Sequence, residues 1–99
     1  MTRYMSRQGD LLFMAIPELP ESLIERPGRV IARGEVTGHS HSLLEGRVLE
    51  DAQGALFLEV LHASQIIHQE HHALDLPSGY YRLIRQREYT PEAIQEVCD

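Results

Sequence analysis

Short apolar segments separated by turn-forming residues run along the whole sequence. Residues 11–16, LLFMAI, are apolar at every position, which predicts a strand that is buried on both faces. The next segment, PELPES at 17–22, contains two prolines that cannot donate to a strand ladder, so the strand ends there. Short segments with such frequent punctuation are typical of an all-β domain.

Alternating segments and turns predict the remaining elements. Pro27-Gly28 is a turn, and DAQG at 51–54 is a hairpin loop between two strands. Thr90 is a helix N-cap followed by Pro91, so residues 91–97 are expected to form a short closing helix. Strands are expected at 29–33, around 39–44, at 47–50, at 55–61, from about 65 to 68 and from 80 to about 88. We therefore predict a small barrel or sandwich of six to eight short strands with a short C-terminal helix.

Length and composition limit the classes of function. The 99 residues predict one domain, spanning 1–99, and 42% hydrophobic residues fit a folded chain. The net charge is −6 and there is no lysine, so an extended nucleic-acid surface is not expected. A single cysteine excludes an internal disulfide and favours a reducing, cytoplasmic location. The longest apolar run has six residues, which is too short to cross a membrane.

The histidines provide the candidate chemistry. In HSH at 39–41, strand alternation puts His39, His41 and Leu43 on one face. Residues two apart on a strand lie about 6.5–7 Å apart at the backbone. Two such imidazoles can bind one ion, since a metal–nitrogen bond is about 2.0–2.1 Å long.

A second group, HQEHH at 68–72, strengthens this prediction. An undistorted strand would put His68, Glu70 and His72 on one face, whereas a bend near Glu70 would pair His68 with His71. The predicted metal ligands are His39, His41, His68 and His71, supported by Glu70 or Glu45; His72 and Glu45 are the alternative ligands. The expected ion is divalent zinc, iron, nickel or manganese.

Two roles for the ion stay open. With an open coordination position, a bound water would be acidified and Glu70 would act as the catalytic proton shuttle of a hydrolytic enzyme. With all positions filled by the protein, the ion would be structural and would contribute folding energy.

Interpretations of the histidine groups that involve no metal ion also stay open. The histidines would then form a surface that titrates near pH 6–7, or they would serve metal-free catalysis. From another class, the chain would be a non-catalytic module that docks onto a protein partner. A small-molecule substrate belongs to the enzyme reading, and a homo-oligomer fits every reading because short β domains pair exposed edges.

The last predicted strand adds a second feature. Tyr81, Leu83, Arg85, Arg87 and Tyr89 fall on one face of it. Its two arginines would hold a carboxylate or phosphate group, or they would pair with the nearby acids Glu88 and Glu92.

Two resemblances follow from these motifs. Residues 34–45, with H-x-H and then Glu45, resemble the first metal motif of the cupins, which implies a metal site on a β-barrel strand. LDLPSGYYR at 74–82 is similar to the second cupin motif, but Arg82 stands where its last histidine would be, so residues 68–72 would have to supply that ligand. The wider string QGD…GEVTGHSH…HQEHH…QREY resembles a family of small, uncharacterised bacterial and phage-associated proteins, and it implies no particular activity.

Overall fold

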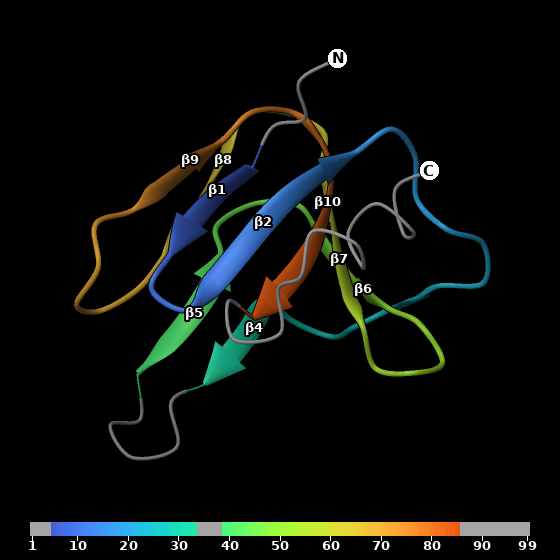
Figure 1. Cartoon of the computed structure of the whole chain (residues 1–99), viewed down its shortest axis with the longest axis horizontal. Coiled ribbons are helices and arrows are strands. Elements are labelled where there is room, and N and C mark those ends of the chain that lie inside the picture. Colours follow the sequence, from blue (N-terminus) through green and yellow to red (C-terminus); the bar gives the residue numbers. More distant parts are fainter. Residues whose placement is uncertain (1–4, 34–38, 86–99) are drawn as a thin grey trace.

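Two antiparallel sheets make up the fold of the computed structural model, which describes residues 5–33 and 39–85 (Figure 1). The larger sheet has the order β1 (Met5–Gln8), β2 (Leu11–Ile16), β10 (Gly79–Arg85), β7 (Leu56–Val60), β6 (Arg47–Glu50) and β3 (Ile24–Glu25). The smaller sheet has the order β4 (Val30–Arg33), β5 (Ser40–Leu43), β8 (Ser64–Ile67) and β9 (Leu74–Leu76).

One apolar core lies between the two sheets. It takes side chains from both of them, so the sheets form a sandwich. The buried members are Leu11, Phe13, Ile31, Leu43, Val48, Leu58, Val60, Ile66, Leu76 and Tyr81. The all-β prediction is confirmed, but the described residues contain ten strands rather than six to eight, and they form no closed barrel.

Strand β2 is buried on both faces, as its uninterrupted apolar run predicts. Phe13 packs in the core between the sheets, whereas Leu12 and Met14 lie on the opposite face with Ile84. The alternation of β10 is also confirmed over the part that is described, because Tyr81 enters the shared core and Leu83 packs against it.

Sequence patterns missed three short strands, β1, β3 and β9. Gly9 and Asp10, which directly precede the strand expected at 11–16, form the two-residue turn of a hairpin in which Gln8 pairs with Leu11. Gly9 has a φ of +58°, a conformation that glycine adopts without a steric penalty. The expected helix at 91–97 lies outside the described residues. Within 5–33 and 39–85, no helix is long and apolar enough to span a membrane.

Replacing Tyr81 by phenylalanine is expected to lower the free energy of unfolding by about 1 kcal/mol. Tyr81 is only 2% exposed, and its hydroxyl donates a hydrogen bond of 2.6 Å to the carbonyl of Pro77. Urea unfolding would measure the loss. The matched control is Tyr80→Phe on the less buried neighbour, which should change stability by less than about 0.5 kcal/mol. Equal effects of the two substitutions would contradict the assignment.

Candidate functional site

Register between β5 and β8 brings the two histidine groups together. Leu43 pairs with Ile66 and Ser42 with Ile67, so continuing the register by one pair sets His41 opposite His68. Directly opposed residues on one face of an antiparallel pair have Cβ atoms about 4.5–5.5 Å apart. His41 follows the inward alternation of Leu43, and His68 follows that of Ile66, so both rings face the side of the core.

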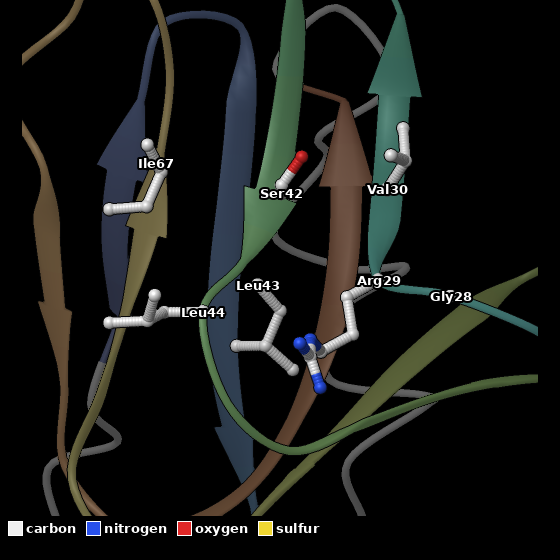
Figure 2. A pocket seen from close by; sticks show the side chains of 7 residues that line it. All are labelled: Gly28, Arg29, Val30, Ser42, Leu43, Leu44 and Ile67. Atoms are coloured by element: carbon white, nitrogen blue, oxygen red, sulfur yellow. The ribbon is translucent and has the colours of Figure 1, made fainter.

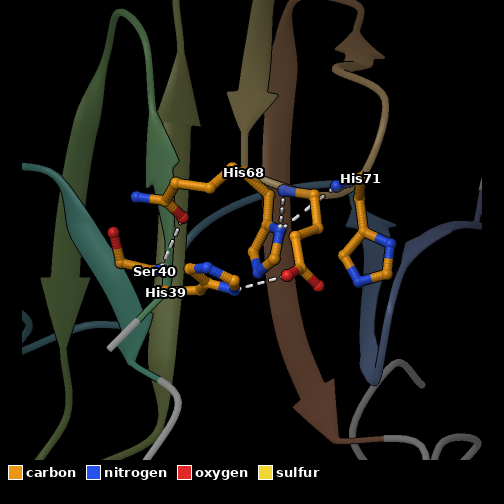
Figure 3. A network of polar contacts seen from close by, with 6 residues as sticks. His39, Ser40, His68 and His71 are labelled. Atoms are coloured by element: carbon orange, nitrogen blue, oxygen red, sulfur yellow. Dashed lines mark hydrogen bonds and ion pairs between the residues drawn. The ribbon is translucent and has the colours of Figure 1, made fainter. Parts of the chain in front are cut away.

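Four imidazole rings form a cluster where β5 begins and β8 ends. The ring centroids of His41 and His68 are 4.4 Å apart, and those of His68 and His71 are 4.5 Å apart. His39 packs edge-on against His68 at 5.6 Å, and His41 lies 6.1 Å from His71. Figure 3 shows His39, His68 and His71 side by side, on the segments that precede β5 and follow β8.

The chain bends directly after β8, and this bend decides which histidines meet. Backbone N–H groups of Glu70 and His71 donate to Nδ1 of His68 at 3.0 and 3.2 Å. The turn therefore pairs His68 with His71, as the bent alternative in the sequence analysis expects, and not with His72. It also leaves the Glu70 carboxylate 3.4 Å from Nδ1 of His39.

Gln8, which is 4% exposed, fixes the orientation of His41. Its amide nitrogen donates to the carbonyls of Ile66 at 2.9 Å and His72 at 2.8 Å. Both amide hydrogens are thereby used, so the amide oxygen faces Nδ1 of His41 at 2.8 Å and accepts a hydrogen bond from the Nδ1–H group. In the neutral ring, Nε2 of His41 consequently carries an unprotonated lone pair.

Burial keeps His41 in this neutral form. Desolvation lowers the pKa of His41 from 6.5 to about 4, and the charges of His68, His71 and Arg85 act in the same direction, opposed by Asp10. Desolvation also lowers the pKa of His68, with further contributions from His71 and His39. Neutral imidazole is the form that binds a metal ion.

A cavity of about 280 Å³ opens onto the cluster. Gly9 lies against the cluster, because a Cβ atom there would lie 2.8 Å from Nε2 of His71 and 3.4 Å from Cε1 of His41. A side chain in place of Gly9 would therefore displace the ring of His71. The lining residues are Asp10, Leu11, Ala32, Arg33, His39, His41, His68, Glu70, His71 and Arg85.

All four predicted histidine ligands and Glu70 therefore line one cavity, whereas Glu45 and His72 do not. Glu45 is exposed and follows β5 at the end away from the cluster. Arg82, at the position of the last cupin ligand, lies over the ring of Phe57 and is absent from the cavity. Within residues 5–33 and 39–85, no three histidine, cysteine or acidic side chains are arranged to hold an ion as they stand.

Sequence reasoning missed Gln8, Gly9 and Arg33 as parts of the site. The dipeptide Gly9-Asp10 was the available signal, since a two-residue turn before an apolar strand implies a partner strand at 5–8. Which residue of that strand would reach His41 depends on how the two sheets pack, and this is not encoded in local pattern.

A second hollow of about 450 Å³ lies on the outer side of the smaller sheet (Figure 2). It is bordered by Leu44 and Ile67, which are 50% and 39% exposed, together with Arg29 and Ser42. None of the histidines contributes to it, so the groove adds no chemistry to the candidate site.

Comparison with known proteins identifies a family but no activity. No curated protein matches the chain, and no solved structure matches it. A family described as a domain of unknown function, DUF8820, matches residues 7–86, a span that includes Gln8, both histidine groups and Arg85. The chain belongs to this uncharacterised DUF8820 family.

Proposed function

We propose that this protein binds one divalent transition-metal ion in the histidine cavity, with His41 as the central ligand. The observation that carries the proposal is the Gln8 amide, which holds His41 with its proton on Nδ1 and the Nε2 lone pair available. Histidine ligands of metals almost always donate their other ring N–H to such an oxygen.

Spacing of the rings supports a shared ion. Two imidazoles bound to one ion at about 2.1 Å, with ligand angles of about 90–110°, have centroids roughly 4.5–5.2 Å apart. The four ring separations in the structure run from 4.4 to 6.1 Å. The proposal requires the rings of His39, His68 and His71 to rotate so that their nitrogens point at the ion, which brings the wider pairs closer. His68 must release the hydrogen bonds to its Nδ1, which is inexpensive because these bonds are exposed to water.

Glu70 is the proposed proton shuttle if the ion keeps an open position. Its carboxylate lines the cavity and lies within 3.4 Å of His39, where it would accept a proton from an ion-bound water. The protein would then act as a hydrolytic metalloenzyme or perform another cupin-like reaction on a small molecule. With all positions filled, the ion would be structural. We also propose a cytoplasmic location, supported by the single cysteine, and a bacterial or phage origin, supported only by the resemblance of the sequence motifs.

Titration of untagged protein with Co²⁺ tests this function, because cobalt absorption in the visible range reports ligand number. We expect one ion per chain, and His41→Ala is expected to weaken binding by about 100-fold or more, since it removes a ligand outright. The matched control is His62→Ala: His62 is exposed and lies outside the cavity, so this variant should bind like the wild type. Wild-type protein that leaves Co²⁺ in its hydrated form would refute the proposal.

A further inference from the structure

Two arginines border the histidine cavity from outside the histidine groups. Arg33 ends β4 and Arg85 ends the described part of β10, so one comes from each sheet. We propose that these two guanidinium groups bind the phosphate or carboxylate group of a small-molecule substrate, with one anion oxygen on the bound ion. This inference rests on the proposed function and names the substrate class for the same cavity.

Neither arginine has an ion-pair partner among residues 5–33 and 39–85. Two arginines elsewhere in this part of the chain are paired: Arg47 binds Glu59 at 2.7 Å and Glu25 at 3.0 Å, and Arg26 lies 3.9 Å from Glu50. In a chain with an excess of acidic residues, two guanidinium groups that border one cavity and have no acidic partner within the described ranges offer their N–H donors to an external anion.

Charge balance favours an anion once an ion is bound. The cavity contains two arginines and two carboxylates, Asp10 and Glu70, so these charges cancel when the histidines are neutral. A divalent cation then adds two positive charges that nothing else in the lining neutralises. The Glu70 carboxylate already lies 3.4 Å from Nδ1 of His39. An incoming dianion would restore neutrality.

Geometry of the guanidinium group indicates the chemical class. Its planar set of N–H donors matches the oxygens of a phosphate or carboxylate and forms charge-assisted hydrogen bonds. Arg85 lines the same cavity as His41, the ligand that we assign to the ion, and its charge acts on that ring. The proposed oxyanion would use the shared cavity to reach both the ion and the arginines. The volume of about 280 Å³ suits a small molecule rather than a polymer.

Anion titrations of the Co²⁺-loaded protein test this inference. The probes are phenyl phosphate, benzoate and uncharged benzamide, and cobalt absorption reports ligand exchange at the ion. We expect phenyl phosphate to bind more tightly than benzoate, and benzamide not to bind, since the site is built for negative charge. The order of the first two distinguishes a phosphate site from a carboxylate site.

Matched arginine variants separate the site from general surface charge. Arg85→Gln and Arg33→Gln are each expected to weaken binding of the preferred anion by about tenfold, which is typical of a lost charge-assisted hydrogen bond. Co²⁺ affinity should change less than about threefold. Arg29→Gln is the control, because Arg29 precedes the same strand β4 but lies outside the cavity.

Failure of the metal site and failure of the anion site give different experimental results. If wild-type protein fails to take up Co²⁺, the proposed function is refuted by the metal titration alone. If Co²⁺ binds but Arg85→Gln and Arg33→Gln bind the anions as tightly as Arg29→Gln does, the metal site stands and the anion site is overturned.

Discussion

Gln8→Met is expected to lower the free energy of unfolding by about 3 kcal/mol and to weaken metal binding by about 10- to 100-fold. The methionine side chain has a similar length but cannot form the three hydrogen bonds of the Gln8 amide. The carbonyls of Ile66 and His72 and the Nδ1–H of His41 would lose their partner together. A buried polar group without a partner costs about 1–3 kcal/mol, and the first of these carbonyls is in a buried contact.

The same chemical change at Gln69 provides the control. The Gln69 side chain accepts one exposed hydrogen bond of 2.9 Å from the backbone N–H of Ser40, and water can replace it. Gln69→Met should therefore shift stability by less than about 1 kcal/mol in urea unfolding. The two variants are then compared by Co²⁺ titration. If Gln8→Met were as stable as Gln69→Met and bound Co²⁺ equally well, Gln8 would not be the residue that fixes the orientation of His41.

The role of Gln8 also explains why the two sheets meet with one defined geometry. Gln8 ends β1 in the larger sheet, yet its partners belong to β8, the loop after it and the segment of β5 in the smaller sheet. A buried side chain that satisfies three groups across the gap favours one relative position of the sheets. The candidate site thus depends on a contact that also stabilises the fold.

Local patterns predict the parts of this fold whose neighbours are close in sequence. The sequence pattern predicts strand β2 from its apolar run and the hairpin of β6 and β7 from its turn residues. The two-residue strand β3 has no such signal, and it exists because its backbone pairs with Leu49 and Glu50 of β6. Pairing between distant segments is a tertiary effect that local pattern does not contain.

In the candidate site, too, local features are predicted from the sequence and contacts between distant segments are not. That His39 and His41 share a face is a property of one strand, and the sequence predicts it. That His41 lies opposite His68 depends on the register between β5 and β8, which are more than twenty residues apart in the chain. The bend that turns His71 toward His68 was only one of two alternatives. The contribution of Gln8 depends on packing between sheets and is therefore visible only in three dimensions.

Gly46→Ala is expected to lower the free energy of unfolding by roughly 3 kcal/mol. The added methyl group would collide with backbone atoms, and the alanine would also be held in a strained backbone conformation. Gly46 has a φ of +126°, which L-residues rarely adopt. A Cβ atom there would lie 2.5 Å from the carbonyl oxygen of Glu59 and 3.0 Å from Cδ2 of Leu43. The oxygen belongs to β7, where Glu59 pairs with Arg47, so it cannot move without disturbing that ladder.

Gly28→Ala separates the clash from the conformational strain. Gly28 also has a positive φ, +77°, but nothing lies within 4 Å of the position of its Cβ. This variant should lose only about 1–2 kcal/mol, the cost of a left-handed residue. Because Leu43 lies on the same strand as His41, displacement of β5 in Gly46→Ala should also weaken Co²⁺ binding, whereas Gly28→Ala should bind normally. Equal losses of stability in the two variants would show that the contact with Glu59 is relieved by a small movement, and that the turn before β6 does not hold β5 in place.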